Sequence, residues 1–195
     1  MSEKQNYSIK TYGHEVLKQN ADPVREINEE IIRLAADMTV MMDKFDGIGL
    51  AAPQIGVSKR VVVLGVPDSP ESRSGSPGEE LLLPMMPLVV INPEIIAVSK
   101  ETVKCDEGCL SVPDIFGPVE RPASVVFRAE LLDGRVIECE CGGLLGRCIQ
   151  HELDHLDGFC FVDRMTESAR NSVAFKLFRL EKYGKKHNFE RPCKK

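Results

Sequence analysis

The chain has 195 residues, of which 43% are apolar and 28% charged, a composition typical of a folded globular protein. Its net charge of −5 argues against a protein that coats nucleic acid, and no apolar run approaches the roughly 20 residues that a membrane-spanning helix needs. The first ten residues do not look like a secretion signal, and the number of cysteines, seven, is odd. We therefore expect a cytoplasmic protein whose cysteines are reduced thiols. We expect residues 1–195 to form one domain.

An amphipathic helix is predicted between Asn28 and Asp46. Asn28 can cap its start, Glu29 and Glu30 suit its positive end, and Gly47 can close it. Apolar residues recur at steps of three and four, which forms a single stripe. The stripe contains Ile31, Leu34, Ala35, Met38, Met41, Met42 and Phe45. We interpret its methionines as core packing.

Two strand-like runs rich in Val and Ile follow, at residues 60–66 and 88–98. The segment between them is dense in Pro, Ser, Gly and Glu, which is typical of surface loops. We therefore expect residues 67–80 to form an exposed and mobile loop inserted into the domain.

A β-hairpin is predicted further along the chain, where residues 124–132 and 135–141 alternate apolar and polar side chains on either side of an Asp-Gly pair. A helix is expected from about residue 144 to 157, ended by Gly158, and a last helix from about 166 to 182. Strands followed by helices indicate an α+β fold with an antiparallel sheet.

The sequence HELDH at residues 151–155 indicates a metal site. His151 and His155 are four residues apart, so their side chains lie on the same face of a helix and both can reach one cation. Glu152 is offset by about 100 degrees and can contact a metal-bound water without ligating the metal. The pattern also occurs by chance, and an ordinary amphipathic helix with hydrogen-bonded histidines is the alternative.

A catalytic metal site needs a third protein ligand and an open position. Cys109, at an expected strand end or turn, is the best candidate. Cys139 and Cys141 alternate with glutamates, which favours thiols packed on the buried face of a strand. His14 and His187 lie in polar surroundings, and we expect both to be solvated.

Three segments, in this order, resemble the signature motifs of the peptide deformylases: GIGLAAPQ at 47–54, EGCLS at 107–111 and QHELDH at 150–155. The resemblance covers roughly residues 11–165. It implies a hydrolase that removes the formyl group from the N-terminal formyl-methionine of nascent proteins and releases formate. It also implies antiparallel sheets packed around a central helix that carries HExxH, with an N-terminal amphipathic helix and a C-terminal helix.

The likeness further implies that Cys109, His151 and His155 ligate one divalent metal ion per chain, with water in the fourth position. One thiolate and two neutral imidazoles suit ferrous iron, zinc, nickel or cobalt. Members of the family generally use ferrous iron in cells. We therefore expect Fe²⁺ natively, and Zn²⁺, Ni²⁺ or Co²⁺ in a purified sample.

The resemblance assigns catalytic roles to three further residues. Glu152 would take the proton of the water and later deliver it to the departing amine. The side-chain amide of Gln54 and the backbone N–H of Leu110, together with the metal, would stabilise the negative charge that develops on the formyl oxygen. Without the resemblance, Gln54 is better interpreted as a loop residue bonded to backbone.

The glycine-rich loop at residues 47–54 is not a dinucleotide-binding turn, because Ala52 stands in the place of the third glycine. The family binds its substrate as an added strand against this loop, where Gly49 would allow close approach of a peptide. The residues that the resemblance implies for the methionine pocket are Ile48, Cys105, Leu144 and Cys148. For Leu144, packing in the core is an equal possibility. The candidates for a charged cluster behind the metal are Glu107, Arg121 and Asp154.

Two other functions remain open. An HExxH metallopeptidase would cut internal peptide bonds, but such enzymes usually take their third ligand downstream of the motif rather than from an upstream thiol. A non-catalytic module with a structural metal would have four protein ligands and no need of Glu152 or Gln54.

The expected partners are formyl-methionyl nascent peptides and, through the basic segment at 166–195, the ribosome. A solvated helix face is an equally good interpretation of that basic segment. Neither a membrane nor a specific DNA site is expected.

Overall fold

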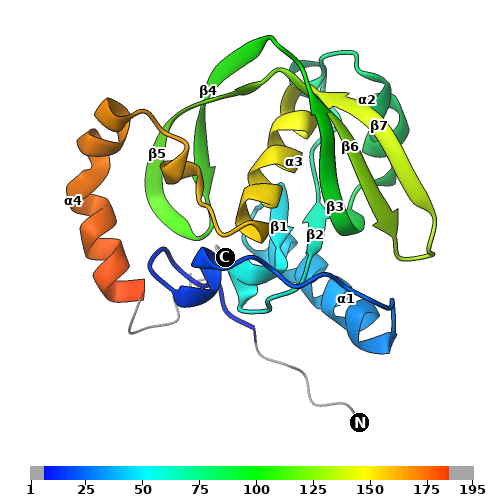
Figure 1. Ribbon diagram of the computed structural model, residues 1–195, viewed down its shortest axis with the longest axis horizontal. Helices are drawn as coiled ribbons and strands as arrows, with labels where there is room; N and C mark the ends of the chain where they lie inside the picture. Colours follow the sequence, from blue (N-terminus) through cyan, green and yellow to red (C-terminus); the bar gives the residue numbers. More distant parts are fainter. Residues whose placement is uncertain (1–6, 185–195) are drawn as a thin grey trace.

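The computed structural model describes residues 7–184, which form four α-helices, seven β-strands and five short 3-10 helices (Figure 1). The α-helices are α1 (Glu29–Lys44), α2 (Pro77–Leu82), α3 (Gly143–Leu156) and α4 (Glu167–Gly184). The strands are β1 (Gly49–Ala51), β2 (Val61–Leu64), β3 (Leu88–Val98), β4 (Thr102–Cys109), β5 (Val112–Pro122), β6 (Ser124–Leu131) and β7 (Val136–Gly142). The 3-10 helices are η1 (Glu15–Lys18), η2 (Ala52–Ile55), η3 (Pro70–Ser72), η4 (Leu83–Met85) and η5 (Phe161–Asp163).

The strands form two antiparallel sheets, as the sequence predicts. Five strands pair in the order β1-β2-β3-β6-β7, and β4 pairs with β5 alone. Strand β2 is buried at every position because it lies between β1 and β3 and is covered by α1 and α3. In Figure 1, α3 lies between the five-stranded sheet and the β4–β5 pair. This arrangement brings the second sheet close to the HELDH segment.

Helix α1 begins as predicted, because the side chain of Asn28 accepts hydrogen bonds from the backbone N–H groups of Glu30 and Ile31. The sequence predicts that Gly47 ends the helix, but the residue that ends it is Asp46, one position earlier. Asp46 takes the left-handed conformation, with φ of 54°, and Gly47 then donates its N–H to the carbonyl of Met42 at 2.9 Å.

Eight of the 14 residues at 67–80 are exposed, as predicted, but the segment is not an irregular loop throughout. The segment contains η3 and the start of α2, and Ser72 and Glu79 are buried. The Glu79 carboxylate accepts hydrogen bonds from the backbone N–H groups of Ser74 and Ser76 at 2.8–2.9 Å. Serine and proline are frequent in loops but also at the first turn of helices, and here they begin α2.

Three apolar clusters hold the elements together. The first packs α3 and α2 on one face of the five-stranded sheet, and the second packs α1 on the opposite face. The third joins β5 to η5 and α4 through residues that include Val119, Phe161 and Leu177. Within residues 7–184, no helix combines the length and the apolar character needed to cross a bilayer.

Candidate metal centre

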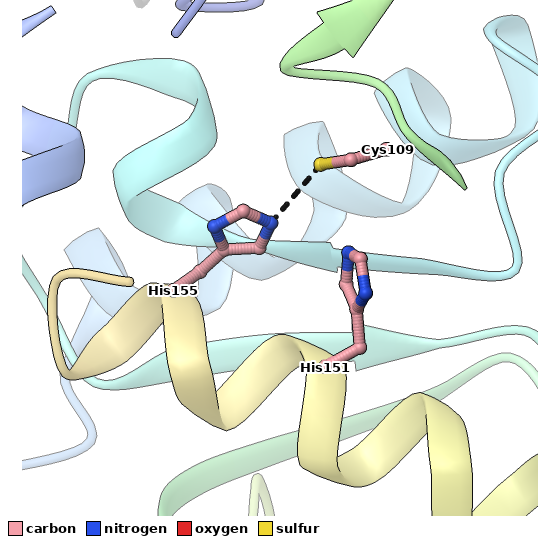
Figure 2. Close-up of side chains that lie close together, drawn as sticks. All are labelled: Cys109, His151 and His155. Carbon is pink, nitrogen blue, oxygen red and sulfur yellow. Dashed lines mark hydrogen bonds between the residues drawn. The ribbon is translucent and has the colours of Figure 1, made fainter. Parts of the chain in front are cut away.

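Three potential ligands converge from two separate segments (Figure 2). Cys109 ends β4, whereas His151 and His155 project toward it from adjacent turns of α3. The Sγ atom of Cys109 lies 3.1 Å from Nε2 of His155, and one ligand atom from each residue falls within 4.8 Å of the other two. Among the residues that the structure describes, this is the group of three or more His, Cys, Asp or Glu side chains arranged to hold an ion.

The electrostatics of the three side chains fit a divalent cation. Burial opposes the charged forms, but the adjacent imidazoles hold the pKa of the Cys109 thiol well below its usual range. Burial likewise lowers the pKa of His151, yet hydrogen bonds to Cys109 and Glu107 more than offset it and raise the pKa to about 9. A thiolate that attracts positive charge into a buried site, with two imidazole nitrogens aimed at the same point, matches the donor set of a transition-metal centre.

Glu152 and Gln54 lie beside this group. Glu152 is buried, and its Oε2 is one of the few buried side-chain atoms in the described chain without a hydrogen-bond partner. The side chain of Gln54 is fixed, because Oε1 accepts the N–H of Ala51 at 2.7 Å while Nε2 points toward the Cys109 sulfur at 3.4 Å. One unpaired carboxylate oxygen and one oriented amide donor therefore face the same region as the ligands.

A cavity of about 460 Å³ opens onto the centre. Leu110, Glu152 and Gln54 line it with two of the three ligands, Cys109 and His151. Of the residues predicted to contact substrate, the cavity is lined by Ile48, Gly49, Leu144 and Cys148.

Cys105 is not among the lining residues. It is exposed on β4, which becomes buried only at Glu107. Its predicted place in the methionine pocket is therefore not supported by its position.

The predicted charged cluster lies behind His151. Arg121 donates to both oxygens of Glu107, at 2.6 and 3.0 Å, and to Asp154 at 2.9 Å. Glu107 in turn contacts Nδ1 of His151 at 2.9 Å. Burial alone would raise the pKa of Glu107, but hydrogen bonds from His151 and Arg121 hold it well below its usual range, so the carboxylate accepts the Nδ1 proton and leaves Nε2 free to bind an ion.

Arg147 was not anticipated from the sequence. It lines the cavity and also donates to Glu107. Its spacing could have indicated it, because Arg147 precedes His151 by one helical turn and therefore lies on the same face of α3 as the two histidines.

The sequence matches the polypeptide deformylase family over residues 6–171. It is 46% identical to peptide deformylase 2 of Gloeobacter violaceus over 158 residues, which cover 81% of this chain and 78% of the relative. It is 42% identical to the peptide deformylase of Novosphingobium aromaticivorans over 173 residues, covering 85% and 92% of the two chains.

Solved structures agree with the sequence comparison. A plant peptide deformylase superposes with a TM-score of 0.80 and 31% identity over the full length of both chains. The peptide deformylase of Ehrlichia chaffeensis superposes with a TM-score of 0.77 and 32% identity, covering 92% of this chain and 98% of the other. Sequence, fold and site geometry together establish that the chain belongs to the peptide deformylase family.

Proposed function

We propose that this chain removes the formyl group from the N-terminal formyl-methionine of nascent polypeptides and releases formate. The observation that carries the proposal is the convergence of one thiol and two imidazoles beside the buried Glu152 carboxylate, next to a cavity of about 460 Å³. Membership of the peptide deformylase family supports the same activity. Because the substrate is a newly made chain, the activity belongs to the cytoplasm, and we assign it to one catalytic domain built around α3.

Cys109, His151 and His155 would hold the ion, which we propose to be ferrous iron natively, with zinc, nickel or cobalt able to replace it. A divalent ion bound there supplies Lewis-acid chemistry, which polarises the formyl oxygen and allows water to attack near neutral pH. With only three ligands from the chain, a fourth position on the ion would remain for water, as a catalytic site requires.

The remaining steps fall to side chains of the chain itself. Glu152 accepts the proton of the attacking water on its unpaired Oε2 and then donates it to the amine that leaves. Gln54 and the backbone N–H of Leu110 donate hydrogen bonds to the oxygen on which negative charge develops. The hydrogen bond from Ala51 keeps the Gln54 amide in the orientation that presents Nε2 rather than Oε1.

The substrate would lie along the loop that precedes β1. Gly49 would lie against the peptide backbone, and Ile48, Leu144 and Cys148 would form the walls that receive the methionine side chain. This arrangement adds the peptide as a further strand to the edge of the five-stranded sheet, because β1 is the end strand.

The decisive experiment compares formate release from formyl-Met-Ala-Ser with cleavage of a blocked peptide at an internal bond, in protein of known metal content. We expect formate release, with one ion per chain. Internal cleavage without formate release would instead identify the protein as an HExxH metallopeptidase, and metal binding without either activity would identify a structural site.

We also propose that α4 contacts ribosomal RNA. Its outward surface carries Lys176, Arg179 and Lys182 beside the exposed rings of Phe175 and Phe178. Replacing the three basic residues with glutamate in the full-length chain should abolish salt-sensitive cosedimentation with ribosomes. Unchanged cosedimentation would mean that this surface is only solvated. The rest of the predicted basic segment, residues 185–195 with His187, lies outside the described residues.

A further inference from the structure

Arg147 connects three elements at the back of the cavity. Its side chain leaves α3 one turn before His151 and is only 13% exposed. Nη2 donates to the carbonyl of Val103 on β4 at 2.6 Å, and Nη1 donates to the carbonyl of Val119 on β5 at 3.2 Å. The helix that carries the two histidines is thereby tied to both strands of the smaller sheet.

The same guanidinium also binds the carboxylate that orients a ligand. Nη1 of Arg147 donates to Oε1 of Glu107 at 2.7 Å, while Oε2 of Glu107 contacts Nδ1 of His151 at 2.9 Å. Arg121 holds Glu107 from the other side, through both oxygens. Glu107 is therefore clamped between two arginines, one from β5 and one from the helix of His151 itself.

Both arginines tie Glu107 to α3, at different points of the helix. Arg121 donates to Glu107 on β4 and to Asp154 in the last turn of α3. Arg147 and His151 are neighbours on one helix face, so the contacts from Arg147 to Glu107 and from Glu107 to His151 close a loop between α3 and β4. If α3 moved along its axis relative to β4, it would have to break this loop, and Cys109 lies two residues beyond Glu107 on the same strand.

We infer that Arg147 is a positioning residue of the metal centre, which fixes the His151 imidazole, through Glu107, at the distance from Cys109 that an ion requires. A lysine cannot replace it, because one ammonium group cannot serve a carboxylate and two carbonyls on different strands in the fixed geometry of a guanidinium. The inference rests on the proposed metal site. It adds Arg147 as a residue that acts on the ion through Glu107 and His151.

The test compares Arg147→Met and Arg147→Lys with the unmodified chain. Both variants retain the aliphatic stem that lines the cavity, and Arg147→Lys also retains the charge in case Arg147→Met does not fold. We expect Zn²⁺ affinity, measured by competition with a chromogenic chelator, to fall about 10- to 100-fold in both. We also expect the visible absorption of the Co²⁺ form to change, and kcat to fall while KM stays nearly constant.

The matched control is Arg33→Met, which removes an exposed helical arginine bonded to Glu29. We expect this variant to bind Zn²⁺ like the unmodified chain. If the Arg147 variants melted earlier but bound Zn²⁺ with unchanged affinity and gave an unchanged Co²⁺ spectrum, Arg147 would be a structural tie only and the inference would be overturned. Failure of the unmodified chain to bind Zn²⁺ or release formate would instead remove the proposed function.

Discussion

Gln54 illustrates what a single side chain reveals only in three dimensions. The residues alone favour a loop glutamine bonded to backbone, and its Oε1 does accept the N–H of Ala51. That same bond turns Nε2 toward Cys109, so the structural bond and the proposed catalytic orientation are one feature. The sequence could suggest Gln54 through family resemblance but could not derive its orientation, because the sulfur that Nε2 faces lies 55 positions further along the chain.

Glu152 provides the first prediction at this scale. Glu152→Gln keeps the size of the side chain but removes its ability to take up a proton. We expect formate release to fall by about 10²- to 10⁴-fold, while the metal content stays at one ion per chain because the three ligands are untouched. Steady-state assays combined with metal analysis measure both quantities.

The control for that variant is Glu140→Gln, which replaces an exposed glutamate on β7. Substantial activity in Glu152→Gln would show that another group carries the proton. Loss of the metal would show that Glu152 supports the ligands rather than the reaction.

Short elements around the site tolerate little change, and Gly49 on β1 is the clearest case. A Cβ atom at Gly49 would meet the carboxylate of Glu152, which is the far end of a flexible side chain, and the sulfur of Cys148. We therefore expect Gly49→Ala to fold and bind metal but to release formate at least tenfold more slowly, since Glu152 is displaced. Near-normal turnover in a folded Gly49→Ala protein would contradict the proposed position of Glu152.

Glu79 anchors the start of helix α2 to the segment that precedes it. Burial alone would raise the pKa of Glu79, but hydrogen bonds from the N–H groups of Ser74 and Ser76 hold it below its ordinary value of 4.5. The carboxylate therefore stabilises the fold above that value, and the contribution is lost as the pH falls through the lower pKa of the folded state.

Glu79→Gln tests these hydrogen bonds. We expect the variant to lose about 1–3 kcal/mol of unfolding free energy at pH 7, because a buried N–H loses its acceptor. The difference from the unmodified chain should shrink as the pH falls below about 4. Urea unfolding at pH 7 and pH 3.5 measures it, and an equal difference at both values would mean that the carboxylate charge contributes nothing.

Most elements could be predicted from periodicity because their core faces repeat regularly. The β3 strand, the hairpin of β6 and β7 and the three long helices all lie where the sequence places them, with ends that differ by a few residues. The burial within residues 67–80 could not be predicted, because Glu79 is a polar residue that points inward to accept hydrogen bonds from backbone N–H groups. No apolar pattern in the sequence indicates such burial. Cys105 was placed in the methionine pocket by the family resemblance alone; it is exposed on β4, and its contact with substrate stays a prediction.

For the whole molecule, the proposed ion joins segments that are distant in sequence, so its removal should destabilise the fold. A ligand present at about 100 times its Kd stabilises the folded state by about 2.7 kcal/mol. We expect a chelator to lower Tm by several degrees in differential scanning calorimetry, with recovery on adding Zn²⁺. Cys109→Ala should show little response to the chelator; an equal response would mean that metal bound elsewhere was responsible.

The centre also lies where the three apolar clusters meet. Cys109 packs against the cluster of β5 and α4, Leu110 against that of α1, and Cys148 belongs to the cluster between α3 and the sheet. The distance between the Cys109 thiol and the two imidazoles therefore depends on how the three clusters pack against one another. Substitutions at remote positions such as Leu177 should alter catalysis. Engineering that repacks one cluster for thermal stability would need to preserve its packing against the other two.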